Sequence, residues 1–278
     1  MGNEVAVVKV ASKDQGVGQL IRIVTAVKNT DAKMQLDVWD CFNAPSNPEL
    51  STITHMGKIV DTESSQSFAI KNLGKTSDFT KPVGLVTAYR ASNNGYLTVK
   101  TWQVDVNGSP QFMKSISLTD AIVPSADPVS SSDLKHRVAI DTVGDGVSGF
   151  FNGHGFMTTF IADTLILNVV TWTADDAGNI TYKAYKQTGG GVVGQALTAT
   201  TTVVMLADDP NTSGTELEMV KVIKWAVAND GTITRPWSKQ PGFRVTNVAA
   251  TNNVVGAFVQ YFPAFTLRLV NWVVLDPP

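Results

Sequence analysis

The sequence predicts an all-β fold built from repeats of one antiparallel unit. A tryptophan closes an apolar run five times along the chain, as Trp39, Trp102, Trp172, Trp225 and Trp272. In three of these copies a glycine follows at the same spacing within a turn sequence of the Asn-Gly, Asp-Gly or Gly-Asn kind: Gly108, Gly178 and Gly231. A strand, a tight turn and a second strand therefore recur.

A second related segment precedes the tryptophan of each copy. It is clearest as RIVTAVKN (22–29), GLVTAYRA (84–91) and GFMTTFIA (155–162). Its spacing from the tryptophan predicts a further hairpin, so that each repeat has four antiparallel strands. Such a sheet cannot bury two apolar faces alone, whereas copies stacked radially around an axis cover both faces of each sheet. The sequence therefore predicts a five-bladed β-propeller of four-stranded antiparallel blades.

The repeats fix approximate boundaries for the predicted blades. These are residues 4–58, 67–118, 136–187, 195–239 and 243–275. In the first blade we expect the fourth strand at 50–58, and in the second blade the first strand at 67–73. The last blade reads as three strands only, at 243–250, 256–262 and 266–275, so we expect it to be three-stranded.

Alternation within the apolar runs favours strands over helices. In YLTVKTW, Leu97 and Val99 face one way, while Thr98, Lys100 and Trp102 share the opposite face. We expect the repeated tryptophans to fill the apolar space between blades, because a ring of this size buries roughly 150–250 Å². A sugar-stacking role for a minority of them is the alternative.

Composition agrees with one compact body, and we expect a single domain over residues 1–278. Charged residues are only 17% of the chain, which suits a fold of strands and turns. The net charge of −2, from 22 basic and 24 acidic residues, gives no field able to hold a polyanion. Nucleic acid is therefore not an expected partner.

The chain shows no sign of membrane insertion or secretion. No apolar run reaches the ~18 residues that span a bilayer, and the first residues do not resemble a signal peptide. We expect a soluble protein, either cytoplasmic or a mature secreted domain, with no membrane partner. The single cysteine, Cys41, excludes an internal disulfide and is expected to be a partly buried strand residue.

A ligand site is expected where loops of several blades meet at the axial opening. The loops between second and third strands, with one strand-end histidine, supply polar side chains that differ from blade to blade, as one asymmetric site requires. The candidates are Arg90, Asn94, Asp163, Asp208, Asp209, Tyr261 and His136. Solvated turn residues are the alternative interpretation of the Asn and Asp in these loops.

Catalytic and metal-binding motifs are not recognisable. The chain has no Gly-x-Ser-x-Gly elbow, no His-Glu-x-x-His and no phosphate-binding glycine loop. Carboxylates that could serve a glycosidase are Asp141, Asp163, Asp208 and Glu216. The insertion at 141–155 carries Asp141, Asp145 and His154, but their order does not match a calcium loop. We expect neither a metal ion nor a cofactor.

The five copies resemble, in number, the five-bladed lectin and glycosidase architectures. The resemblance covers nearly all of the chain and rests on the form of the repeat, because no functional motif of such a family can be matched to residues here. It implies a fold that serves binders, hydrolases, lyases and scaffolds alike.

These observations lead to one functional expectation and two alternatives. We expect a non-catalytic binding propeller for a carbohydrate or another small polar ligand at the loop-rich axial face. The first alternative is a glycosidase or lyase acting in the same pocket, and the second is a protein-interaction scaffold.

The three-stranded last blade carries a consequence for assembly. Its run TLRLVNWVVL (266–275) exposes a row of unpaired backbone groups that has to be covered or paired. We expect a symmetric partner to cover it in a two-fold homodimer, or else the N-terminal residues if the blade boundaries are shifted by one strand.

Overall fold

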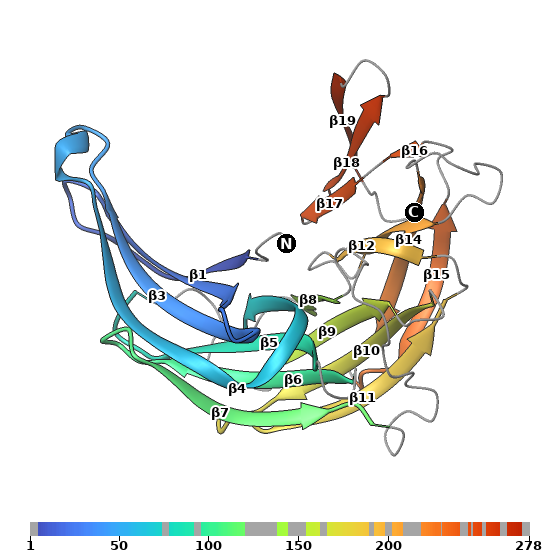
Figure 1. The fold of residues 1–278 in the computed structure, drawn as a ribbon, viewed down its shortest axis with the longest axis horizontal. Coiled ribbons are helices and arrows are strands. Elements are labelled where there is room, and N and C mark those ends of the chain that lie inside the picture. Colours follow the sequence, from blue (N-terminus) through green and yellow to red (C-terminus); the bar gives the residue numbers. More distant parts are fainter. Residues whose placement is uncertain are drawn as a thin grey trace. The chain divides into compact units, whose positions relative to one another are not determined.

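The computed structural model confirms the all-β prediction. It describes residues 5–73, 78–91, 96–119, 138–143, 154–161, 166–188, 192–197, 202–207, 218–228, 230–239, 244–245, 247–251, 254–261 and 266–273. Strands paired antiparallel make up most of these residues (Figure 1), and the one helical element among them is the 3₁₀ turn η1 (Pro48–Leu50). No helix in this part of the chain is long and apolar enough to cross a membrane.

The strands follow one another in the order that the repeat predicts. They are β1 (Val5–Asp14), β2 (Gln19–Lys28), β3 (Lys33–Asn43), β4 (Thr52–Asn72), β5 (Val83–Ala91), β6 (Leu97–Val104), β7 (Pro110–Ser117), β8 (Val138–Thr142), β9 (His154–Ile161), β10 (Leu167–Ala174), β11 (Ile180–Gln187), β12 (Val192–Leu197), β13 (Thr202–Ala207), β14 (Glu218–Val227), β15 (Ile233–Lys239), β16 (Arg244–Val245), β17 (Asn247–Thr251), β18 (Val254–Tyr261) and β19 (Thr266–Val273).

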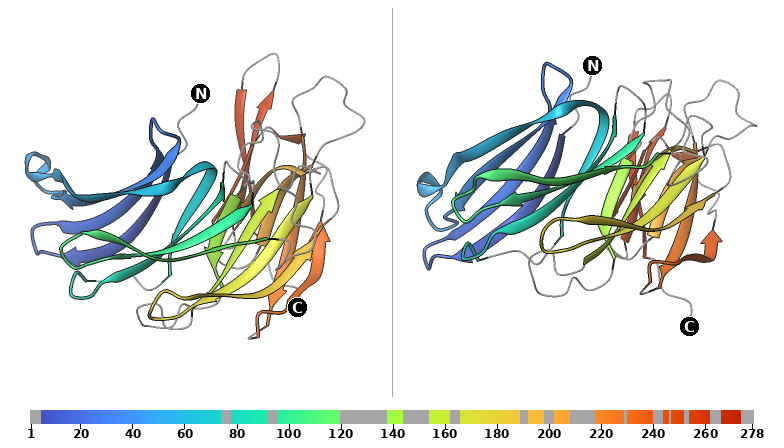
Figure 2. Two further views of the ribbon diagram at one scale, coloured as in Figure 1. Left: turned by 60° about the horizontal axis from the view of Figure 1, so that its bottom comes forward. Right: turned by 90° about the horizontal axis from the view of Figure 1, so that it is seen from below.

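Sequential neighbours pair in every sheet. Strands β1 to β7 form one path in chain order (Figure 2). Strands β8 to β11 form a four-stranded sheet, and β12 to β15 form another, in which the short β16 also pairs with β14. The last sheet has three strands among the described residues, β17, β18 and β19.

The chain divides into two compact units. Unit 1 comprises Met1–Pro124, Asp145–Gly155 and Thr173–Thr181, and unit 2 comprises Ser125–Gly144, Phe156–Trp172 and Tyr182–Pro278. Strands β1 to β7 belong to unit 1, together with the turn at 173–181 that joins β10 to β11. The prediction of a single domain stays a prediction.

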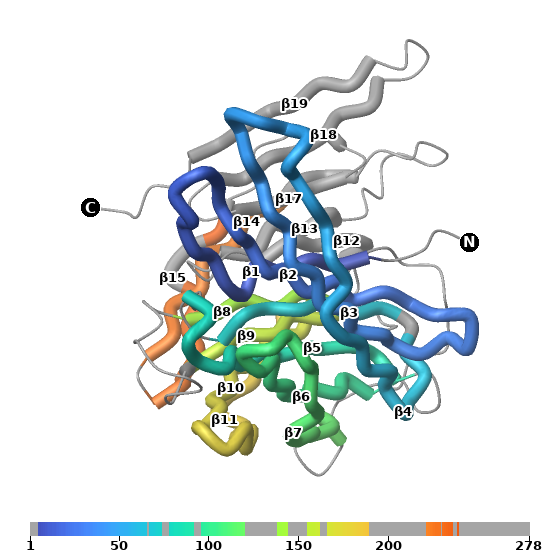
Figure 3. Tube along the Cα trace, turned by 90° about the vertical axis from the view of Figure 1, so that its left-hand side faces the viewer, coloured from blue at the N-terminus to red at the C-terminus, as the bar shows by residue number. Residues whose placement is uncertain are grey.

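The first two repeats are joined differently from the prediction. The strands expected at 50–58 and 67–73 are two halves of one strand, β4, which runs beside β3 and then beside β5 (Figure 3). The pairing with β3 runs from Thr52 to Val60 and returns at Ser64, and Ser65 begins the pairing with β5. The intervening stretch is polar, but it holds no glycine or proline to break the strand, so the chain stays extended.

Three of the repeat tryptophans, Trp39, Trp102 and Trp172, make the same hydrogen bond through the indole Nε1. The indole Nε1 of Trp102 donates to Thr87 Oγ1 at 2.8 Å, and that of Trp172 donates to Thr158 Oγ1 at 2.8 Å. Trp39 does the same to Thr25 Oγ1 at 3.0 Å. A buried indole needs a partner for its single donor, and a threonine on the neighbouring strand supplies it.

The turn glycines dock against other repeats. Gly108, Gly178 and Gly231 have φ of +86°, +77° and +91°, a backbone region that favours glycine. The Gly178 carbonyl accepts a hydrogen bond of 2.7 Å from Thr101 Oγ1, and the Gly231 carbonyl accepts one of 2.7 Å from Thr171 Oγ1. A Cβ added at Gly178 would lie 2.8 Å from Met113 Cβ, so the turn packs closely on β7.

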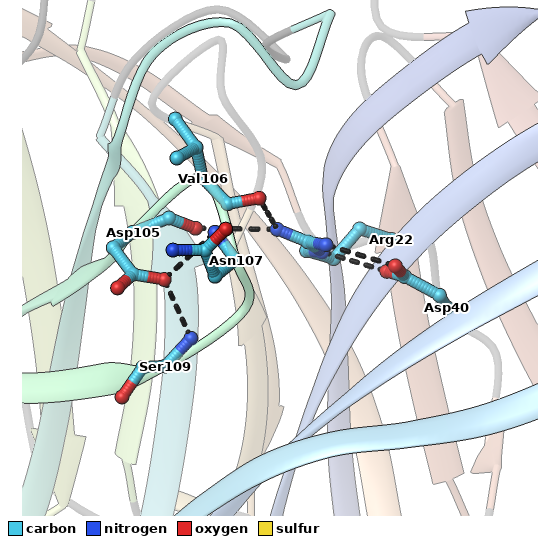
Figure 4. A network of polar contacts seen from close by, with 6 residues as sticks. All are labelled: Arg22, Asp40, Asp105, Val106, Asn107 and Ser109. Carbon is cyan, nitrogen blue, oxygen red and sulfur yellow. Dashed lines mark hydrogen bonds and ion pairs between the residues drawn. The ribbon is translucent and has the colours of Figure 1, made fainter.

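The Gly108 turn is held by an arginine instead of a threonine (Figure 4). Arg22 binds Asp40 through two hydrogen bonds, at 2.6 and 2.8 Å, and is 4% exposed. Its Nη1 donates to the carbonyls of Asp105 and Val106, at 3.2 and 2.9 Å. A bidentate pair of this kind fixes the guanidinium plane, so Arg22 is already oriented for the turn.

Apolar packing follows the same direction from repeat to repeat. In unit 1, Trp102 belongs to one core cluster with Val24, Leu36 and Val38 of the first repeat. In unit 2, Trp225 shares a cluster with Met157 and Val169 of the third repeat. The face that bears the tryptophan (the Trp face) is thus covered by the opposite face of the repeat before it.

The Trp face of the first repeat is the exception among the described residues of unit 1. Val7, which pairs with Thr25 on this face, is 57% exposed, and Ile53, which pairs with Cys41, is 74% exposed. Trp39 itself is half-buried, in contrast to Trp102 at 2%. This face is built like the covered ones but has no cover within unit 1.

The close packing of the Gly178 turn predicts that a methyl group added at this position lowers the free energy of unfolding. Gly178→Ala combines a positive φ, which costs about 1–2 kcal/mol, with a clash against Met113 and Thr101 that adds a further ~1–3 kcal/mol. Gly16→Ala is the matched control, because Gly16 has φ +79° but no atom within 4 Å of an added Cβ. Urea unfolding should show the larger loss for Gly178→Ala, and equal losses would contradict the docking.

Candidate functional site

Four charged or ionisable side chains converge in unit 1. We call Asp61, Glu63, Tyr89 and Lys100 the carboxylate cluster. Lys100 Nζ donates to Asp61 Oδ1 at 2.6 Å and lies 3.7 Å from Glu63 Oε2, while Tyr89 Oη donates to the same Glu63 oxygen at 2.6 Å. Three strands supply these residues, β4 the two carboxylates, β5 the tyrosine and β6 the lysine.

The local folding of β4 explains how the carboxylates meet the lysine. Asp61 and Glu63 lie in an irregular stretch of β4, where the register against β3 shifts between Val60 and Ser64, and both carboxylates lie beside the Lys100 ammonium. This part of β4 comes just before Ser65, which pairs with Ala91 at the end of β5. The cluster therefore lies near the end of the second repeat where β5 connects to β6, the same end at which sequence analysis expected a ligand.

Lys100 occupies a position that is apolar in later repeats. It stands two residues before Trp102, and the matching residues before Trp172 and Trp225 are Val170 and Ile223, both fully buried. Lys100 is itself only 3% exposed. A buried ammonium needs a carboxylate partner, and Asp61, 5% exposed, provides it. At this position the second repeat thus has an ion pair, whereas the third and fourth repeats have apolar residues.

Two acceptor atoms in this region have no donor among the described residues. Asp61 Oδ2 is buried while its other oxygen binds Lys100, and Ser65 Oγ is buried two positions beyond Glu63. The Glu63 side chain is 44% exposed. The cluster is therefore buried at Asp61 and open to solvent at Glu63, with acceptor capacity to spare.

Tyr89 acts as a fixed neutral donor. Burial of its ring raises the pKa of the phenol well above the ordinary value, and the hydrogen bond to Glu63 raises it further. Its ring and that of Phe112 also lie beside the ammonium, with centroids 5.4 and 5.8 Å from Lys100 Nζ. Tyr89 thus orients the Glu63 carboxylate at any physiological pH.

A second polar group lies on the Trp face of the first repeat. His55 Nε2 is 3.0 Å from Asp37 Oδ1, and the His55 ring meets Trp39 edge-on at 4.7 Å. Cys41, the single cysteine of the chain, lies two residues beyond Trp39 on β3. Burial and the charge of Asp40 raise the pKa of its thiol, which keeps it protonated. This arrangement does not supply an activated nucleophile.

The structure places the sequence-predicted site residues as follows. Arg90 lies in β5 rather than in a loop, and its side chain is fully buried. Tyr261 ends β18. Asn94, Asp163, Asp208, Asp209 and His136 lie outside the described residues, as do Asp145 and Glu216. Because Arg90 is buried, its replacement by Ala is expected to lower stability as well as any binding.

Asp61, Glu63, Tyr89 and Lys100 were not among the predicted candidates. The signals were present: a lysine inside the apolar run YLTVKTW, and two carboxylates alternating in DTE at 61–63. The polar stretch around these carboxylates resembles a connection between blades, and this polarity hides its strand geometry. Within the described part of the chain, no three His, Cys, Asp or Glu side chains are placed to hold a metal ion.

No protein-family model and no curated protein sequence matches this chain. The functional argument therefore rests on the geometry of the carboxylate cluster.

The raised pKa of Tyr89 predicts how stability depends on pH. Above the ordinary tyrosine pKa of 10.0, the unfolded chain releases the phenolic proton while the folded chain keeps it. Stability contributed by this group is complete below that pH and falls as pH rises, by about 1.4 kcal/mol per pH unit. In urea unfolding up to about pH 11, Tyr89→Phe should remove this part of the decline. An identical pH profile for both proteins would contradict the assignment.

Proposed function

We propose that the protein is a non-catalytic binding protein for a carbohydrate or another small polar ligand, which it holds at the carboxylate cluster. The observation that carries the proposal is the Glu63 carboxylate, half-exposed and fixed by Tyr89 at 2.6 Å. Sugar hydroxyls are hydrogen-bond donors, and an acceptor that is already oriented loses little entropy when it binds one.

The departure from the repeat supports one asymmetric site. The position two residues before the repeat tryptophan is apolar in the third and fourth repeats, at Val170 and Ile223, but charged in the first two, at Asp37 and Lys100. The buried pair of Lys100 and Asp61 costs desolvation energy that an apolar pair avoids. A ligand-binding role would account for this pair at the end of the repeat where loops join the strands.

A glycosidase is the second candidate, because Asp61 and Glu63 form a carboxylate pair. Such enzymes place the scissile bond between one protonated and one charged carboxyl group. Here the Lys100 ammonium stands next to both carboxylates, at 2.6 and 3.7 Å, in the place that the glycosidic bond would need. The geometry therefore favours binding over hydrolysis.

We propose further that the repeats close into a five-bladed β-propeller. This proposal is supported by the docking of the Gly108, Gly178 and Gly231 turns and by the covering of the Trp102 and Trp225 faces by a preceding repeat. A ring would also supply a repeat to cover the Trp face of the first one. An open stack would leave Val7 and Ile53 in water.

A glycan array followed by titration tests the binding function. The wild-type chain should retain at least one glycan, and Glu63→Gln should weaken its binding by roughly 10- to 100-fold, the worth of a hydrogen bond to a charged group. Its melting temperature should stay nearly unchanged, because Glu63 is half-exposed. Glu49→Gln, at an exposed glutamate of η1, is the control and should bind normally. Equal binding by Glu63→Gln and wild type would refute the proposed site.

A further inference from the structure

We infer that the ligand group received by the carboxylate cluster is a protonated amine, which makes an amino sugar with a free amine the sugar class that fits. This inference rests on the proposed function and specifies its ligand. It follows from the charge balance, the spare acceptors and the aromatic neighbours of the cluster.

The charge balance of the cluster is negative. Asp61 and Lys100 form one close pair at 2.6 Å, which leaves the Glu63 carboxylate with the same ammonium only at 3.7 Å. Two carboxylates therefore share one ammonium among the described residues of the cluster. In a partly buried site this charge attracts a cation more strongly than it would in water, and it repels an anionic ligand.

The spare acceptors match an ammonium group better than a hydroxyl group. Asp61 Oδ2, on a side chain 95% removed from solvent or more, has no donor among the described residues, and Glu63 lies beside the same ammonium. An ammonium carries three donors, whereas a hydroxyl carries one. Glu63 is the carboxylate open to solvent, whereas Asp61 Oδ2 is buried, so the ammonium binds Glu63 directly and reaches Asp61 Oδ2 only by displacing the atoms that cover it.

The aromatic rings beside the cluster also favour a cationic ligand. Tyr89 and Phe112 already lie within cation–π range of the Lys100 ammonium, and Phe112 is 49% exposed. Phe112 is the exposed ring of the two, since Tyr89 is fully buried, and its negative face favours a cation over a neutral group. An acetylated amine has neither the charge nor the three donors, so N-acetylation is expected to remove the advantage.

The test compares three sugars that differ at one position and adds a minimal probe. Calorimetric titration of the full chain with glucosamine, glucose and N-acetylglucosamine should give an affinity for glucosamine at least about tenfold higher than for the other two. Methylammonium chloride should compete with glucosamine. In Glu63→Gln the preference for glucosamine should disappear, while Glu49→Gln should keep it.

The outcomes separate this inference from the function on which it rests. If the three sugars bind equally well and binding depends on Glu63, the amine specificity is wrong and the carbohydrate function stands. If methylammonium binds in a Glu63-dependent manner and no sugar does, the cation site stands and the carbohydrate function falls. If neither methylammonium nor glucosamine binds, the inference is overturned.

Discussion

At the described junctions the structure depends on the covering of a tryptophan-bearing sheet face by the preceding repeat. A four-stranded sheet with apolar residues on both faces is unstable in water. A repeat that packs against its neighbour covers one of the neighbour's two faces. Three features recur: the buried indole, the threonine that accepts the indole hydrogen bond at Trp102 and Trp172, and the glycine turn that docks on the preceding repeat. Their geometry is repeated closely, with indole bonds of 2.8 Å at Trp102 and Trp172 and threonine–carbonyl bonds of 2.7 Å at Gly178 and Gly231.

The same constraint explains why the carboxylate cluster stands out. A position that must be buried in every repeat has little freedom, so apolar residues such as Val170 are its ordinary occupants. Asp37 and Lys100 depart from this pattern in the first two repeats, and Lys100 needs Asp61 to compensate its charge, at a desolvation cost that an apolar residue avoids. Sites that lower stability in this way are the first candidates for a functional role.

Sequence reasoning succeeded where the repeat determined the structure. Trp102 and Trp172 were assigned to the apolar space between sheets, and both are almost completely buried. Gly108 and Gly178 were assigned to tight turns, and both have positive φ. These features are local or repeated, so a single sequence displays them several times.

It failed where the fold depends on pairing over longer distances. Nothing local shows that residues 59–66 continue as a strand, because their polarity is typical of loops and only the partners β3 and β5 keep them extended. For the same reason, the contact of Asp61 with Lys100 could not be foreseen. Arg90 was expected in a loop, but it is a buried strand residue, since β5 extends as far as Ala91.

The proposed ring would also cover the Trp face of the first repeat, which is exposed among the described residues of unit 1, and a charge placed on this face tests that proposal most directly. Val7→Glu should lower the free energy of unfolding by about 2 kcal/mol or more if a repeat covers Val7, because the carboxylate would then be buried. Val17→Glu, at a 70% exposed turn residue, should cost less than about 0.5 kcal/mol. The difference should be the same at low and high protein concentration. Equal, small effects of both substitutions would show that the face is open to water and would contradict the account.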